Sequence, residues 1–262
     1  QPSNDGIPTA MHVAALEAVE KDVIAGLESL AAELGAKEAA LDDVVKTGRT
    51  HLQDATPVRL GQEFGGYRTQ IEKGIDRLEA TRERLGELAL GGTATGTELN
   101  THPEFPELAA ANIAEETALR FREADNHFEA QAAHDAMNEA NGALRTVAGS
   151  MNKIANDLRL LASGPRNGLG EIEQPENQPG SSIMPGKINP VVAESVNQVH
   201  KQVVGNDAAV SAGAARGEID LNLYKPVIAS NFLESASLIA NAAETFGCRF
   251  VGKLEANAEH CK

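Results

Sequence analysis

The chain has 262 residues, only 3% of them aromatic, and a formal net charge of −15, which argues against nucleic acid or an anionic membrane surface as a partner. This acidity is typical of a cytoplasmic protein, and a salt-adapted source is the alternative explanation. No apolar run reaches the roughly 20 residues of a membrane helix, so we expect no membrane partner. Cys248 and Cys261 lack metal-ligand spacing, and the simplest interpretation is that both are reduced in a cytoplasmic location.

Up to residue 163 the chain contains three predicted helices, because apolar residues recur there at alternating spacings of three and four. The first begins near Pro8, a residue suited to a first helical turn, and Gly35 ends or interrupts it. The second runs from about residue 62 to residue 85. The third and longest runs from about 126 to 163, which makes it roughly 50 Å long.

Two more helices are predicted after residue 190. One is marked by valines from Val192 to Val203, after which glycines break the pattern, and the last runs from about Val227 to Phe246. The chain has no alternating strand pattern of useful length. We therefore expect an all-α fold, an elongated bundle of long helices packed side by side, which forms one central helical-bundle domain over residues 1–262.

Polar segments rich in glycine and proline separate the predicted helices. Residues 47–57 have no helical stripe and are expected to form a loop. Residues 91–97 have the glycine spacing of a phosphate-binding loop but lack its lysine and its preceding strand, so we expect no nucleotide there. Residues 180–190 combine glycines and prolines with two hydroxyls, one ammonium and one carboxamide, which are groups suited to binding a small anion.

His51 is a candidate general acid or base, because the ordinary pKa of imidazole, about 6.5, suits either role near neutral pH. The alternative is a surface histidine. Ser181 is either a reactive hydroxyl or a turn residue, and Lys187 is either an anion ligand or a solvated loop lysine. Glu194 is either part of a site or an ordinary first-turn acid that the helix dipole favours.

Ser3 and Asn4 precede the first predicted helix, where they are either helix caps or ligands. No metal site is expected, because the paired histidines of the chain lack the i, i+4 spacing or the nearby carboxylates of a zinc site. The pairs are His127 with His134 and His12 with His51.

Three segments, taken in their order along the chain, resemble the signature loops of the fumarase/aspartase superfamily. Residues 180–190, Gly-Ser-Ser-Ile-Met-Pro-Gly-Lys-Ile-Asn-Pro, resemble the superfamily signature. Residues 1–5 and 48–57 resemble its first and second conserved loops. Further matches lie at residues 8–12, 60–64, 91–94, 99–104, 163–166 and 221–228. The resemblance therefore covers nearly the whole chain.

Within the superfamily, the chain is most similar to class II fumarases. His51 stands where aspartases typically have glutamine, and Gly186 stands where they tend to have alanine. Residues 191–199 look more like the aspartase continuation. Argininosuccinate and adenylosuccinate lyases fit less well over the whole chain.

The resemblance implies a homotetramer in which long helices of four subunits form a central core, with each active site shared among three subunits. It implies reversible hydration of fumarate to L-malate by anti elimination and addition through an aci-carboxylate intermediate, with no metal and no organic cofactor. The expected partners are thus a small dicarboxylate substrate and further copies of the chain. The alternatives are an aspartate ammonia-lyase and a non-catalytic helical assembly that retains the lyase fold.

The resemblance also implies roles for single residues. Ser181 is the expected base that takes the carbon-bound proton, with Lys187 and N–H groups of the loop stabilising its oxyanion. His51 is the expected acid at the leaving hydroxyl, and Glu194 is expected to hydrogen-bond its imidazole. The residues expected to bind substrate carboxylates are Ser3, Asn4, Thr50, Lys187 and Asn189.

Two features depart from the family pattern. Pro2 stands where the family usually has serine or threonine, which removes one hydroxyl that binds a carboxylate. Family members also carry an N-terminal region before the position of Gln1 and a small helical domain after that of Lys262. We therefore expect a fragment without both termini, and strongly reduced activity if these residues are all that is present.

Overall fold

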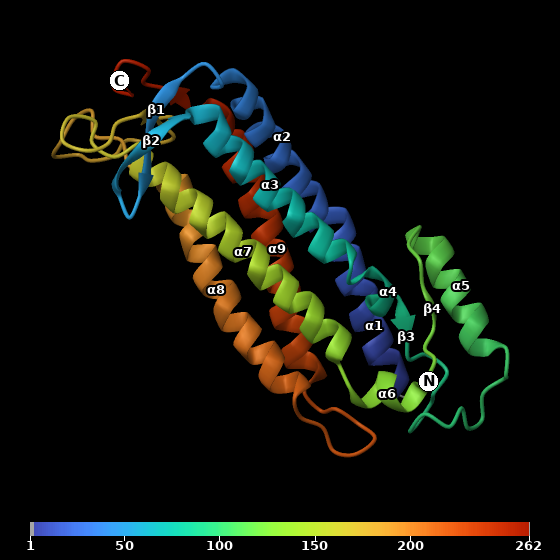
Figure 1. Ribbon diagram of the computed structural model, residues 1–262. Helices are drawn as coiled ribbons and strands as arrows, with labels where there is room; N and C mark the ends of the chain where they lie inside the picture. The colour runs from blue at the N-terminus through green and yellow to red at the C-terminus, as the bar shows by residue number, and fades with distance from the viewer. Residues whose placement is uncertain (1–2, 262) are drawn as a thin grey trace. The chain divides into compact units, whose positions relative to one another are not determined.

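A computed structural model describes residues 3–261, and Pro2 lies outside the described residues. Long helices dominate the described chain, and short two-stranded sheets are added to them (Figure 1). The helices are α1 Ser3–Glu17, the π-helix η1 Ala18–Ile24, α2 Ala25–Ala40, α3 Leu60–Glu79, α4 Arg82–Leu85, α5 Phe105–Thr117, α6 His127–Ala132, α7 Asp135–Leu161, α8 Val191–Ala214, α9 Lys225–Arg249 and the 3-10 helix η2 Val251–Lys253. The expected all-α fold is confirmed.

The strands form three small sheets of two strands each among the described residues. The strands are β1 Val45–Thr50, β2 Gln53–Arg59, β3 Glu87–Leu88, β4 Arg122–Glu123, β5 Ile172–Glu173 and β6 Glu255–Ala256. The pairs β1–β2 and β5–β6 are antiparallel, whereas β3–β4 is parallel. Within residues 3–261, every helix is either too short or too polar to cross a membrane.

The chain divides into two compact units, each with an apolar core. Unit 1 comprises the chain up to Ile24, Asp76–Thr146 and Gln202–Leu238, and unit 2 comprises Ala25–Ile75, Val147–Lys201 and the chain from Ile239 on. Fully buried side chains of unit 1 include Val19, Leu85, Met137, Leu144, Val210 and Phe232. Those of unit 2 include Leu27, Leu30, Phe64, Ile71, Ile154, Leu158 and Phe246.

Small residues and polar pairs hold the helices of unit 2 against one another. A Cβ atom on Gly26 of α2 would come within 2.9 Å of the carbonyl oxygen of Ala240 in α9, so these two backbones approach closely only because residue 26 is glycine. The Tyr67 hydroxyl of α3 donates to the Asp157 carboxylate of α7 at 3.1 Å. Burial and the nearby carboxylate raise the pKa of Tyr67, which therefore stays a donor.

The helix boundaries differ from the predicted ones where local sequence rules compete with packing. The first helix begins at Ser3, so Pro8 lies inside it, and it continues beyond Gly35 to Ala40. A single glycine inside a helix costs about 1 kcal/mol relative to alanine, which tertiary packing outweighs. The predicted 126–163 helix is two helices, because Ala133 is extended and separates α6 from α7.

The prediction of a loop over residues 47–57 was wrong, because most of this segment lies in the β1–β2 hairpin. Nearly every side chain of β2 is exposed, so its residues have no reason to alternate between apolar and polar. Helix α5 was likewise not predicted, since only Pro106 and Ala110 of its residues are buried. Conversely, α8 runs through Gly205 and Gly213, where the pattern had suggested a break.

Candidate functional site

The candidate acid His51 lies at the tip of the β1–β2 hairpin in unit 2. Thr50 pairs with Gln53, so His51 and Leu52 form a two-residue turn with φ angles of 54° and 60°. Two-residue hairpins of this kind need positive φ at both positions and usually have Asn-Gly there. Larger side chains in the left-handed region are strained, and such strain is concentrated at functional sites. His51 is exposed, and its ring has no hydrogen bond or ion pair with residues 3–261.

A buried carboxylate connects this hairpin with the segment that leads into the 180–190 loop. The Glu171 side chain is 3% exposed and accepts a hydrogen bond of 2.6 Å from Nη1 of Arg49 in β1. Its other oxygen lies 3.2 Å from Nζ of Lys46, which also bonds Glu63 at 3.0 Å. Buried charges are tolerated only when paired, so these pairs fix the hairpin relative to residue 171. In Figure 1 the hairpin and the yellow loop that follows residue 171 lie at the same end of unit 2.

The 180–190 loop is folded back on itself by local hydrogen bonds. The Ser181 hydroxyl oxygen accepts the N–H groups of Ile183 and Met184, both at 3.2 Å. The Asn189 amide donates to the carbonyl of Gly180 at 2.8 Å and so closes the loop. The result is a half-buried serine oxygen that faces two backbone donors, which is an arrangement able to stabilise negative charge on that oxygen.

The other predicted residues of this region are placed around the same loop. Lys187 is exposed, and its ammonium group makes no hydrogen bond or ion pair with the described residues. Glu194 lies in the first turn of α8, where its carboxylate is 3.5 Å from the guanidinium of Arg159. Arg159 also donates to Asn197 at 3.0 Å. Within residues 3–261, then, the contact of Glu194 is with Arg159, and its expected bond to His51 stays a prediction.

Ser3 and Asn4 form the start of α1 in unit 1. The Asn4 amide donates to the carbonyl of Ala94 at 2.6 Å, and the exposed Ser3 makes no side-chain hydrogen bond to the described residues. Asp5 is fully buried, and one of its carboxylate oxygens accepts the N–H groups of Gly91 and Thr93 at 3.1 Å each. The segment from Gly91 to Ala94 is therefore attached directly to the residues that begin α1.

Four of the residues that position these candidates could not be found by sequence reasoning. Lys46, Arg49 and Glu171 form one ion cluster, but 122 residues separate Arg49 from Glu171. Such a separation leaves no periodic or spacing signal. Asp5 directly follows Ser3 and Asn4, and its carboxylate accepts backbone N–H groups of a distant loop. Only a resemblance to a family of known structure could have indicated these partners.

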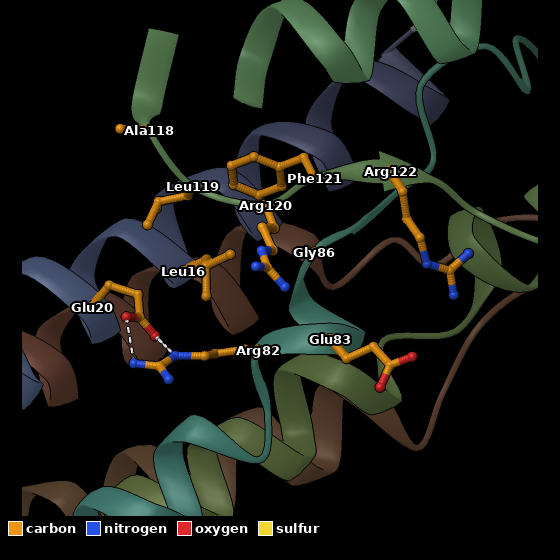
Figure 2. A pocket seen from close by; sticks show the side chains of 10 residues that line it. All are labelled: Leu16, Glu20, Arg82, Glu83, Gly86, Ala118, Leu119, Arg120, Phe121 and Arg122. Carbon is orange, nitrogen blue, oxygen red and sulfur yellow. Dashed lines mark hydrogen bonds and ion pairs between the residues drawn. The ribbon is translucent and has the colours of Figure 1, made fainter. Parts of the chain in front are cut away.

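A cavity of about 690 Å³ lies within unit 1 and is lined by none of the predicted site residues. Figure 2 shows apolar Leu16, Leu119 and Phe121 on one part of its wall and the guanidinium of Arg120 beside them. Arg82 also lies at the wall and is hydrogen-bonded to Glu20, which raises the pKa of Arg82 above its ordinary value. The cavity is thus a separate feature from the predicted site.

The fold, the serine held by backbone donors and the strained histidine turn together define the class of protein. The chain belongs to the lyase family, whose family model matches residues 1–205. It is 79% identical over all 262 residues to the class II fumarate hydratase of Halobacterium salinarum, and it covers 56% of that protein. It is 56% identical over 263 aligned positions to the class II fumarate hydratase of Corynebacterium efficiens, again covering 56% of it.

A solved structure gives the same result for the fold. The class II fumarase from Schistosoma mansoni superposes with a TM-score of 0.97 at 38% identity, over 100% of this chain and 58% of that one. The resemblance to class II fumarases is therefore confirmed. The chain spans a little over half the length of these relatives.

Proposed function

We propose that the whole protein catalyses the reversible hydration of fumarate to L-malate. The observation that carries the proposal is the Ser181 hydroxyl oxygen, which two backbone N–H groups approach at 3.2 Å in a loop that also carries Lys187 and Asn189. The relatives at 79% and 56% identity, both class II fumarate hydratases, support the same reaction. They do not favour the alternative of an aspartate ammonia-lyase.

In the proposed mechanism the Ser181 alkoxide takes the proton from the carbon next to a malate carboxylate. The electron pair of the broken C–H bond passes into that carboxylate as an aci-carboxylate, with a second negative charge. This intermediate then forms the carbon–carbon double bond and expels the hydroxyl, which leaves as water after protonation by His51. Donors held in place before the reaction are the most effective means of stabilising such charge, and the N–H groups of Ile183 and Met184 are in that position for the serine oxygen.

The remaining predicted residues would bind the two substrate carboxylates. Lys187 offers an ammonium group that has no partner within residues 3–261, and Asn189 offers a carboxamide on the same loop. Thr50 is next to His51 at the hairpin tip. Ser3 and Asn4 would contribute from the start of α1. We further propose a homotetramer whose active sites combine residues of several subunits, in which the partner of Glu194 is His51 of another subunit. A cytoplasmic location is part of the same proposal.

The experiment compares two adjacent serines. Ser181→Ala should lower fumarate hydration by at least about a hundredfold, since removing a general base typically costs that much or more. Ser182→Ala is the matched control, because Ser182 is exposed and makes no side-chain hydrogen bond with the described residues. Equal activity of the two variants would contradict the role of Ser181.

Release of ammonia from L-aspartate, compared with loss of water from L-malate, distinguishes the two lyase reactions. No turnover of either substrate would favour the non-catalytic assembly.

A further inference from the structure

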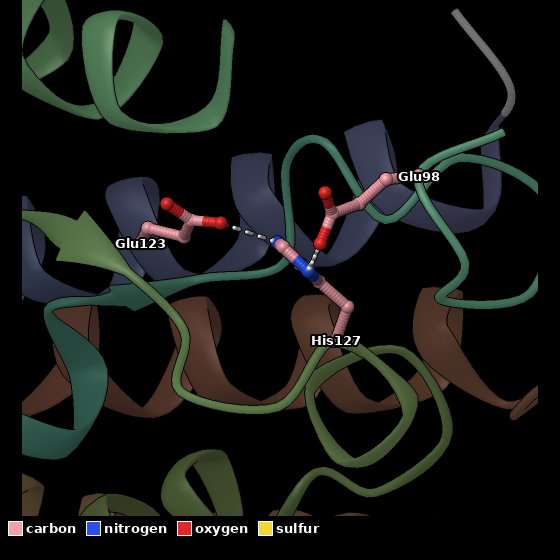
Figure 3. A group of neighbouring side chains, drawn as sticks. All are labelled: Glu98, Glu123 and His127. Atoms are coloured by element: carbon pink, nitrogen blue, oxygen red, sulfur yellow. Dashed lines mark ion pairs between the residues drawn. The ribbon is translucent and has the colours of Figure 1, made fainter. Parts of the chain in front are cut away.

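Three side chains of unit 1 that the proposed reaction does not use come together at the start of α6. His127 is the first residue of α6, Glu123 is the last residue of β4, and Glu98 lies in the loop that follows β3. Nδ1 of His127 is 3.4 Å from a Glu98 carboxylate oxygen, and its Nε2 is 3.6 Å from a Glu123 oxygen. Figure 3 shows Glu123 beside one ring nitrogen of His127 and Glu98 beside the other.

The imidazole of His127 is buried, although one of its two nitrogens makes no hydrogen bond to the described residues. The side chain is 5% exposed, and its Nε2 has no hydrogen-bond partner among residues 3–261. Buried polar atoms are nearly always hydrogen-bonded, so an unbonded ring nitrogen beside two carboxylates needs a further partner. A cation that accepts the nitrogen lone pair and neutralises the carboxylates would satisfy all three groups.

We propose that Glu98, Glu123 and His127 bind a divalent transition-metal ion. One ligand atom from each residue can be chosen so that the three atoms lie within 4.8 Å of one another. Ligands at the usual distance of about 2.1 Å from such an ion are separated by roughly 3.0–3.5 Å, so small side-chain rotations close the site. One imidazole nitrogen with two carboxylate oxygens suits Zn²⁺ or Co²⁺ better than Mg²⁺ or Ca²⁺, which prefer oxygen ligands alone.

The backbone around the cluster holds His127 in place before any ion binds. The Asn126 side chain caps α6 by accepting the N–H groups of Phe128 and Glu129 at 2.9 and 3.1 Å. A Cβ atom on Gly92 would come within 2.8 Å of Cβ of His127, so the loop that carries Glu98 packs directly against the first turn of α6. Glu98 is 47% exposed and Glu123 is 35% exposed, which leaves a route for the ion and room for water as a further ligand.

The bound ion would connect the loop after β3, strand β4 and helix α6. The same loop is bonded to α1 by two side chains. The Asp5 carboxylate accepts backbone N–H groups of the loop, and the Asn4 amide donates to a loop carbonyl. An ion here would therefore stabilise the backbone next to Asn4. The proposed metal site stands independently of the proposed hydratase reaction.

The test is titration of the metal-free protein, without an affinity tag, with Co²⁺ alone. We expect one ion per chain, visible d–d absorption typical of a nitrogen and oxygen ligand set, and displacement of Co²⁺ by Zn²⁺. Glu98→Gln and Glu123→Gln should each lower the affinity at least about tenfold, since each removes a ligand charge with little change in volume. Both residues are partly exposed, so folding should be retained, and circular dichroism checks that it is.

Glu104→Gln is the matched control, because Glu104 and His102 form another carboxylate–imidazole pair, at 3.8 Å, in which both side chains are exposed. Its Co²⁺ affinity should equal that of the parent protein. The proposal is overturned if the parent protein binds no Co²⁺ at about 1 mM, which would mean that the carboxylates only pair with the histidine ring. It is also overturned if binding survives both Glu98→Gln and Glu123→Gln, or if the control weakens it as much as they do.

Discussion

The carbonyl oxygen of Lys187 occupies the space that a Cβ atom on Gly180 would need. The two ends of the 180–187 segment therefore meet, and the Asn189 amide donates to the carbonyl of the same glycine at 2.8 Å. Only glycine allows this approach, so the path of the loop around Ser181 depends on residue 180.

Gly180→Ala should accordingly open the loop and lower fumarate hydration by tenfold or more, because the donors around Ser181 would move. The melting temperature should change by less than about 2 °C, since most of the loop is exposed and contributes little to the core. Steady-state kinetics and thermal unfolding measure the two effects. Gly66→Ala is the control, because an added Cβ there has nothing within 4 Å, and its activity should match that of the parent protein. Unchanged activity in Gly180→Ala would show that this loop conformation is not required.

Leu52→Gly should stabilise the protein by about 0.5–1 kcal/mol. The φ angle of Leu52 is 60°, a left-handed conformation that costs a leucine roughly 1–2 kcal/mol, and its side chain is 65% exposed, so its removal loses little burial. Chemical denaturation measures the change. Leu108→Gly is the matched control, since Leu108 is 57% exposed but helical, and glycine there should cost about 1 kcal/mol. Destabilisation by Leu52→Gly would contradict the strained turn.

Asp5→Asn should destabilise the protein by about 1–3 kcal/mol, although the two side chains have nearly the same shape. The fully buried carboxylate accepts two backbone N–H groups. An asparagine amide would either make weaker, uncharged bonds to these N–H groups or turn its own NH2 donor toward them. Urea unfolding monitored by circular dichroism checks this. The same substitution at the exposed Asp22 should change the free energy of unfolding by less than about 0.5 kcal/mol, and equal effects at both positions would contradict the capping role.

The stability should fall as the pH is lowered from about 6.5 to 4, with a contribution from His134. Burial, and then the charges of His12 and Lys225, lower the pKa of His134 to about 4. The unfolded chain, with an ordinary histidine pKa, therefore binds the proton first, so this contribution is fully present above pH 6.5 and is lost toward pH 4. At 1.36 kcal/mol per pKa unit, the loss reaches about 3 kcal/mol.

Unfolding free energies measured at several pH values in parent and His134→Gln proteins test this contribution. The variant should depend less steeply on pH between 4 and 6.5, whatever its stability at pH 7. Equal slopes would mean that His134 does not titrate differently in the folded and unfolded protein.

The sequence by itself determined the helical class and the chemistry of the 180–190 loop. Helix periodicity depends on residues three and four apart, and the behaviour of glycine, proline and serine in the loop depends on their nearest neighbours. Both are local properties, which is why the stripes of α3, α7 and α9 were predicted. The helix boundaries were predicted less well, because packing carries α2 past Gly35 and α8 past Gly205.

Only the tertiary structure decided which distant groups meet. The pairing of Arg49 with Glu171, the cap that Asp5 provides for Gly91 and the approach of Glu98 to His127 join residues that no local rule relates. The hairpin around His51 was also missed, because an exposed strand has no apolar alternation, and cross-strand hydrogen bonds rather than burial define it. These contacts depend on long-range packing energies, and the amino-acid pattern near each residue does not encode them.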